Sequence, residues 1–260
     1  MQNSLINLDP VLLRIAGFQL TWYWLVYFLG AILSPFLISK INAKEGLGLD
    51  RSTIIKGSLL IAFGYIIGGR LGYALFYNPE YYFENPYELF QIYKGGMSFH
   101  GAIIGSTVLT LLSFRKETLK AWRFLDIVVT IVPWFLILGR VSNFLNGELI
   151  GRKTEAPWGV IFSHVDQFSR HPSQIYEAIG EGLVLGLILW FSRDFKKVTQ
   201  QCSHFLMGYG VIRIILEFFR EPDPHIGFVM EVFTLGQVYC LYMVIAGLWL
   251  RKKFIETTEN

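Results

Sequence analysis

Three arginines stand where a charged side chain is costly. Arg70, Arg140 and Arg213 each lie within or at the end of a long apolar run. An arginine at bilayer depth is disfavoured by roughly 2.5 to 3.5 kcal/mol on insertion scales, so each must be offset by a partner. A guanidinium is a planar fork of donors that suits a phosphate or a carboxylate. We expect Arg140 and Arg213 to bind a phosphate at the membrane surface and Arg70 to be structural. The alternative is a structural ion-pair network for all three.

Further polar residues accompany two of these arginines. Asn143 follows Arg140 by three residues and shares its face if the helix continues, so it is expected to hold the arginine or a headgroup hydroxyl. Tyr209, Arg213, Glu217 and Arg220 are spaced i, i+4, i+8 and i+11, which predicts one stripe along a helix.

The histidines offer one candidate base. His100 is flanked by Gly96, Gly101 and Gly105, so the pattern predicts an open backbone that a ligand could approach closely. A hydrogen-bonded structural histidine is the alternative. His171 is predicted to start a helix with Ser173 as its cap. The other histidines have no companions at metal-ligand spacing, so no metal site is expected; these are His164, His204 and His225.

The composition predicts an all-α, polytopic membrane protein. Hydrophobic residues make up 53% of the 260-residue chain, and the mean hydropathy is +0.42. The apolar runs predict about seven transmembrane helices in a single domain over 1–260. A ladder of Gly64, Gly68 and Gly72 is interpreted as close helix packing. The predicted spans are Leu20–Ile38, Ile54–Tyr77, Met97–Phe114, Phe124–Leu138, Ile175–Phe191, His204–Phe219 and Val232–Leu250.

Basic residues predict the orientation of these spans. Fourteen of the 23 Lys and Arg residues fall in alternate loops, around Lys40–Lys56, Arg115–Arg123, Arg193–Lys197 and Arg251–Lys253. Lys and Arg are retained on the cytoplasmic side, so the N-terminus is expected to be periplasmic and the C-terminus cytoplasmic. The net charge of +3 is then mainly a topology signal, and no basic-aromatic pattern indicates a nucleic-acid partner.

With this orientation, the unusual polar stretches share one depth. Each of them falls at the outward end of a predicted span, which indicates a polar site near the periplasmic face. Tyr23 is mainly an interface residue, although its hydroxyl could also line this site. The stretches are "GGRLGYALFYN", "GGMSFHGA", "GRVSNFLNGELIG", "HPSQIYEA" and "RIILEFFREPD".

These five stretches, in this order and spacing, closely resemble the prolipoprotein diacylglyceryl transferase family, and the likeness covers nearly the whole chain. Two positions depart from the family pattern, because Ser142 and Ala102 stand where the family commonly has glycine. The resemblance implies a multi-pass enzyme of the bacterial inner membrane. Its two substrates would be the membrane lipid phosphatidylglycerol and prolipoprotein signal peptides with a lipobox cysteine.

The implied reaction moves the diacylglyceryl group onto the cysteine thiol, forming a thioether and releasing glycerol phosphate. The nucleophile belongs to the substrate, and the phospholipid carries its own leaving group, so no cofactor, metal or nucleotide is expected. The resemblance implies His100, Arg140 and Arg213 as catalytic residues, with His100 as the candidate base. It implies seven substrate-binding residues: Tyr23, Asn143, Glu148, Gly151, Tyr209, Glu217 and Arg220.

A transporter or channel is the competing class, because charges within the membrane can also line a conduit. Two features disfavour it. The odd-numbered predicted spans lack a continuous polar face towards the cytoplasm, and the chain shows no inverted repeat.

Overall fold

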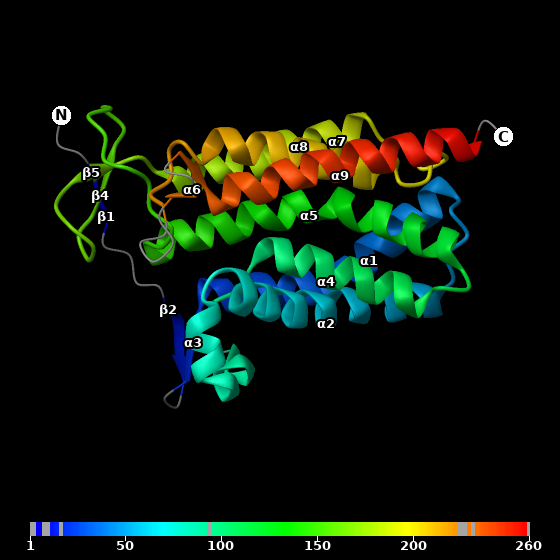
Figure 1. The fold of residues 1–260 in the computed structure, drawn as a ribbon, viewed down its shortest axis with the longest axis horizontal. Coiled ribbons are helices and arrows are strands. Elements are labelled where there is room, and N and C mark those ends of the chain that lie inside the picture. The colour runs from blue at the N-terminus through cyan, green and yellow to red at the C-terminus, as the bar shows by residue number, and fades with distance from the viewer. Residues whose placement is uncertain are drawn as a thin grey trace. The chain divides into compact units, whose positions relative to one another are not determined.

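The computed structural model describes residues 4–6, 11–15, 18–92, 95–222, 228–229 and 232–258, and it is mostly helical (Figure 1). The α6, π-helical η3 and α7 segments follow one another without a break. The helices are α1 (Trp22–Glu45), α2 (Arg51–Phe76), α3 (Pro79–Glu84), the 3-10 helix η1 (Pro86–Phe90), α4 (Phe99–Ser113), α5 (Thr118–Asn146), α6 (Ser173–Glu177), η3 (Ala178–Val184), α7 (Leu185–Phe191), α8 (Gln200–Leu216) and α9 (Leu235–Thr258).

Among the described residues, four helical segments are long and apolar enough to cross a membrane: Leu25–Glu45, Arg51–Phe76, Thr118–Asn146 and Ser173–Phe191. Large apolar side chains on α1 and α2 face outwards, as lipid-facing residues do, with Ile32 and Phe63 70% and 58% exposed. Helix α4 is apolar but shorter. Helix α4 lies within a predicted span, and α8 and α9 each overlap one, although a count of seven crossings stays a prediction.

Contacts divide the chain into two compact units, Met1–Ile32 with Val129–Asn260 and, separately, Leu33–Val128. The predicted single domain remains a prediction. In the second unit, α2 and α4 run side by side (Figure 1). A Cβ on Gly64 would lie 2.5 Å from Ser106 Cα, and one on Gly72 would lie 2.8 Å from Gly101 Cα. The glycine ladder is therefore confirmed as a packing feature, because only glycine lets these backbones approach so closely.

Arg70 holds the connection between α2 and α4. Its side chain is buried and donates to carbonyl oxygens of Glu88, Leu89, Gln91, Gly95 and Gly96, residues that are close in the chain. Together these five carbonyl oxygens accept a hydrogen bond from each of the five N–H groups of the Arg70 guanidinium. Arg70 is thus a structural residue, as the sequence indicates.

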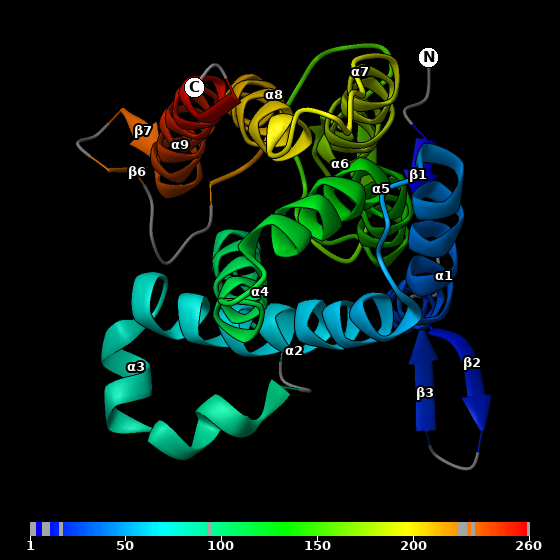
Figure 2. The same cartoon turned by 90° about the vertical axis from the view of Figure 1, so that its right-hand side faces the viewer.

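In the first unit, α8 packs along α9, with Ser203 Oγ donating to the Gly247 carbonyl over 2.9 Å. Short strands flank the helices, and Figure 2 shows the β2–β3 hairpin. Strand β4 pairs in parallel with β1 and antiparallel with β5, whereas β6 and β7 lead into α9. The strands are β1 (Ser4–Ile6), β2 (Val11–Ile15), β3 (Phe18–Thr21), β4 (Val160–Phe162), β5 (Ser169–Arg170), β6 (Phe228–Val229) and β7 (Phe233–Thr234).

Candidate active site

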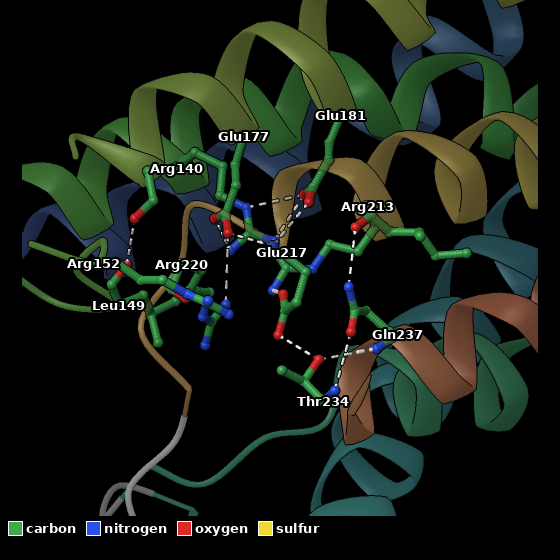
Figure 3. Close-up of polar contacts among 12 residues, drawn as sticks. Arg140, Leu149, Arg152, Glu177, Glu181, Arg213, Glu217, Arg220, Thr234 and Gln237 are labelled. Atoms are coloured by element: carbon green, nitrogen blue, oxygen red, sulfur yellow. Dashed lines mark hydrogen bonds and ion pairs between the residues drawn. The ribbon is translucent and has the colours of Figure 1, made fainter. Parts of the chain in front are cut away.

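A buried cluster of alternating charges lies within the first unit (Figure 3). It is built from α5, from the α6–η3 segment, and from α8 with the turn after it. Each element contributes side chains that point towards the others. The cluster consists of Arg140, Glu177, Glu181, Arg213, Glu217 and Arg220.

Two glutamates separate the arginines. Arg140 donates through Nε and Nη2 to Glu181 Oε2, at 3.1 and 2.8 Å, and its Nη1 lies 2.9 Å from Glu177 Oε2. Arg213 Nη1 donates to Glu181 Oε1 at 3.2 Å and also to Glu177 Oε1. Each carboxylate therefore bridges Arg140 and Arg213, which come from α5 and α8.

Neither Glu177 nor Glu181 was among the site residues predicted from the sequence. Both side chains are completely buried and lie four residues apart in the mostly apolar helical run Ser173–Phe191. An acidic pair at this spacing inside a predicted span was the available signal, because intramembrane carboxylates need a cationic partner. Glu181 lies in the π-helical turn η3, and π turns inside α-helices are frequent at functional sites.

The charges of the cluster balance. Three arginines face three glutamates, and each arginine side chain is at most 12% exposed. Removing one partner of such a buried pair costs roughly 3 to 5 kcal/mol, because the other charge is left without compensation. The expected phosphate-binding arginines are thus held by carboxylates, and they form one connected network.

The sequence predicted that Tyr209, Arg213, Glu217 and Arg220 lie along one face of a helix. This prediction is correct only for Tyr209 and Arg213, which lie on α8. Tyr209 and Arg213 are buried on α8, and Arg213 Nη2 lies 2.5 Å from Glu217 Oε2. The helix ends at Leu216, however, so Glu217 is its C-cap residue and Arg220 lies beyond the helix. The prediction of one helical face through Arg220 was wrong, because regular periodicity does not reveal where a helix stops.

Arg220 is connected to the site through both its backbone and its side chain. Its backbone pairs with Gly151, and its carbonyl accepts a hydrogen bond from Arg152 Nε over 2.9 Å. Its Nη1 lies 3.7 Å from Glu177 Oε1, the longest ion pair of the cluster.

Two residues of the C-terminal part support Glu217. The Thr234 hydroxyl donates to Glu217 Oε1 over 2.9 Å, and Gln237 Oε1 accepts from the Thr234 backbone N–H (Figure 3). Thr234 is at the end of β7 and Gln237 is in the first turn of α9. Neither was expected from the sequence, because their role depends on how α9 packs against α8.

Asn143 and Glu148 bind each other. Asn143 Nδ2 donates to Glu148 Oε2 at 3.2 Å, and the Glu148 backbone N–H donates to the Asn143 carbonyl at 2.9 Å. Gln174 Nε2 donates to the Glu148 carbonyl at 2.5 Å. The side chain of Asn143 was expected to hold either Arg140 or a headgroup hydroxyl. The first of these expectations was wrong, because the Asn143 amide binds Glu148 instead.

In the loop between α5 and α6, close packing requires a glycine at position 151. A Cβ at Gly151 would lie 2.8 Å from His171 Cβ, and the Gly151 carbonyl accepts from Arg170 Nη1 at 2.9 Å. Gly147 and Leu149 have φ values of +66° and +54°, so the chain turns sharply just after α5.

His100 belongs to the other unit, in the first turn of α4 after the N-cap residue Ser98. The glycines around it do not form the open surface that was predicted. A Cβ on Gly101 would lie 2.9 Å from Gly72 Cα, and one on Gly96 would lie 2.7 Å from the Tyr73 ring. The expectation of ligand access at these glycines was wrong, because α2 and Tyr73 occupy the space.

Four further residues that carry predictions from the sequence are Ser173, His171, Tyr23 and His225. Ser173 does not cap α6 as predicted, because Pro172 is at the N-cap position and the Ser173 hydroxyl donates to the Leu149 carbonyl over 3.0 Å. Burial lowers the pKa of His171, whose Nδ1 is 3.2 Å from the Tyr176 hydroxyl. Tyr23 lies in α1, but its side chain is outside the part that the structure describes, as is His225.

The described residues contain no group of three or more His, Cys, Asp and Glu side chains that could hold a metal ion. The cluster offers instead two guanidiniums held at fixed separation, an arrangement that suits a phosphate.

Comparison with known proteins gives consistent matches over nearly the whole chain. The family model described as prolipoprotein diacylglyceryl transferase matches residues 10–252. A phosphatidylglycerol–prolipoprotein diacylglyceryl transferase of Rickettsia canadensis (strain McKiel) is 41% identical over 245 residues, covering 93% of this chain and 95% of the relative. Similarly named proteins of Rickettsia rickettsii (strain Sheila Smith) and Rickettsia typhi (strain ATCC VR-144 / Wilmington) are 40% and 41% identical over 248 residues. In both cases the match covers 94% of this chain and 96% of the relative.

Proposed function

The chain belongs to the prolipoprotein diacylglyceryl transferase family, and we propose from this that it transfers the diacylglyceryl group of phosphatidylglycerol to a prolipoprotein. The observation that carries the proposal is the arginine pair, Arg140 and Arg213, held together by Glu177 and Glu181 in a buried setting. Two adjacent guanidiniums oppose the charge that develops on a departing phosphate, and they do so best where water is scarce.

The reaction is a displacement at carbon. The sulfur of the lipobox cysteine forms a bond with the glyceryl carbon, and the bond from that carbon to the phosphate oxygen breaks. The bonding electron pair leaves with the phosphate, so glycerol phosphate departs with an added negative charge. The thiol proton goes to a base, for which we propose His100, since a thiol of reference pKa about 8.5 is mostly protonated at neutral pH.

The remaining expected residues are proposed to bind substrate or to shape its site. Gly151 and Arg220 are supported by their backbone pairing, and Asn143 and Glu148 by their mutual hydrogen bonds. Tyr209 is supported by its burial on α8, and Glu217, the C-cap residue of that helix, by its burial and its ion pair with Arg213. Tyr23 is proposed from the family resemblance alone.

We also propose a specific placement in the cell. The chain would form one catalytic domain over 1–260, with seven transmembrane helices, a periplasmic N-terminus and a cytoplasmic C-terminus. It would lie in the bacterial inner membrane with the site near the periplasmic face. The four membrane-length apolar helices and the uneven distribution of basic residues support this arrangement.

The test is a transfer assay with purified protein in phosphatidylglycerol vesicles and a peptide that carries a lipobox cysteine. We expect a thioether-linked diacylglyceryl peptide and one glycerol phosphate released per peptide. The same peptide with serine in place of cysteine is the control and should yield neither product. A folded protein that forms no thioether would refute the proposed activity, and lipid or ion movement without transfer would favour a transporter.

A further inference from the structure

Glu181 occupies a distinctive place in the charged cluster. Its Oε2 accepts two hydrogen bonds from Arg140, and its Oε1 accepts one from Arg213 (Figure 3). Among the ion pairs of the described residues, those of Glu181 go to these two arginines alone, whereas Glu177 also reaches Arg220. A change at Glu181 therefore acts on the proposed phosphate-binding pair without directly disturbing Arg220.

The two arginines would hold an anion too tightly if nothing opposed them. A guanidinium has five N–H groups, so the contacts described here leave donors on both arginines for a phosphate. The phosphodiester of the substrate carries one negative charge, whereas a phosphate monoester carries about 1.5 to 2 at neutral pH. An uncompensated arginine pair would consequently favour the product over the substrate, and product release can limit turnover.

We propose that Glu181 is a positioning residue with two linked effects. It fixes Arg140 and Arg213 next to each other, and its negative charge weakens their hold on the released glycerol phosphate. This inference rests on the proposed function, because it assigns these arginines to the phosphate of the lipid.

Two substitutions of Glu181 distinguish its effect on the position of the arginines from the effect of its negative charge. Both carboxylate oxygens of Glu181 are engaged, so the amide in Glu181→Gln can accept hydrogen bonds from only one of the two arginines, and the charge is lost. Glu181→Asp keeps the charge, but its shorter side chain cannot span both arginines. Glu117→Gln, which changes an exposed glutamate, is the matched control.

Binding and turnover are measured separately, with glycerol phosphate as the probe. We expect Glu181→Gln to bind glycerol phosphate at least about tenfold more tightly by titration calorimetry, because one opposing charge has been removed from a poorly screened site. Its kcat should fall at least about tenfold. Glu181→Asp should show a similar fall in kcat with a Kd within about threefold of the parent.

The inference is overturned if folded Glu181→Gln binds glycerol phosphate as weakly as the parent, or more weakly. Should that variant fail to fold, Glu181→Asp decides: a parental kcat would exclude the positioning effect, and a much lower Kd would exclude the charge effect. Because calorimetry needs no turnover, this result is independent of the proposed function. That function fails only if the parent forms no thioether.

Discussion

Arg140 and Arg213 require the guanidinium group and not only a positive charge. Arg140 bonds Glu181 through two nitrogens while a third lies against Glu177, and Arg213 contacts three carboxylates. A lysine ammonium is a point charge that cannot span these partners. We therefore expect Arg140→Lys and Arg213→Lys to lose about 100-fold or more in transfer, measured as thioether formed.

Folding must be monitored alongside this loss. Arg115→Lys, at an exposed position, is the matched control and should keep parental activity. Arg140→Lys and Arg213→Lys should still insert into the membrane and elute as the parent does in size-exclusion chromatography. Near-parental transfer by both variants would show that the arginines are structural ions only.

The role of His100 can be tested by measuring how the loss of transfer rate in a His100 variant depends on pH. If its imidazole takes the thiol proton, His100→Gln should lower the transfer rate by roughly 100-fold, the scale of general-base catalysis. The deficit should shrink above about pH 8.5, where the substrate supplies thiolate unaided. A deficit that stays constant from about pH 6 to 9.5, with chemistry rate-limiting, would leave His100 a positioning role.

At the scale of elements, the α2–α4 contact depends on its glycines. A Cβ on Gly68 would lie 2.8 Å from Gly105 Cα, and α4 carries His100 in its first turn. We expect Gly68→Ala to destabilise the protein by about 1 to 3 kcal/mol, because backbone must move to admit the methyl group. Thermal unfolding in detergent measures this change.

Gly139→Ala is the matched control for that substitution. It lies within α5 as Gly68 lies within α2, but a Cβ there would meet nothing within 4 Å. Alanine also favours the helix over glycine, so its unfolding temperature should equal or exceed that of the parent. An equal loss of stability in both variants would contradict the packing explanation.

The loop between α5 and α6 depends on Arg170, which bonds the Asp166 carboxylate and the Gly151 carbonyl. Hydrogen bonding from Arg170 holds the pKa of Asp166 below its usual value of 3.8. The stabilisation is therefore fully present above about pH 3.8 and is lost as the pH falls through the lowered pKa. Hydrogen exchange of residues 152–170 should show protection falling in that acidic range.

Arg170→Gln tests the origin of this acid sensitivity. Without the guanidinium the pKa of Asp166 should return towards 3.8, so the loop should be less protected above pH 3.8 and should lose less protection on acidification than in the parent. The helices of the first unit should remain protected. An acid-induced loss of protection as large in Arg170→Gln as in the parent would show that another group controls the loop.

For the whole molecule, the distribution of basic residues predicts which side each loop faces. A cysteine introduced near Lys196, or added at the C-terminus, should resist a membrane-impermeant thiol reagent applied to intact cells, because both lie on the cytoplasmic side. A cysteine at Asn3, which lies outside the described residues, should react. These experiments need a Cys202→Ser, Cys240→Ser background, and labelling of the C-terminus from outside would refute the orientation.

The sequence by itself determined the class of the molecule and most of its helices. Apolar runs of membrane length are a local property, so all seven predicted ranges fall largely on helices of the structure. The Gly64–Gly72 ladder and the structural role of Arg70 were likewise readable, because small-residue spacing and the cost of a charge in lipid are visible in the chain.

Only the tertiary structure decided which groups the charges meet. Arg140 and Glu181 are 41 residues apart, and Arg213 and Glu181 are 32 apart, so no local pattern pairs them. The packing of α2 against the glycines near His100 likewise follows from contacts between distant segments, and the periodicity of the sequence does not show that α8 ends at Leu216. A sequence shows that a buried charge must have a partner, but the partner is chosen by the helices that pack beside it.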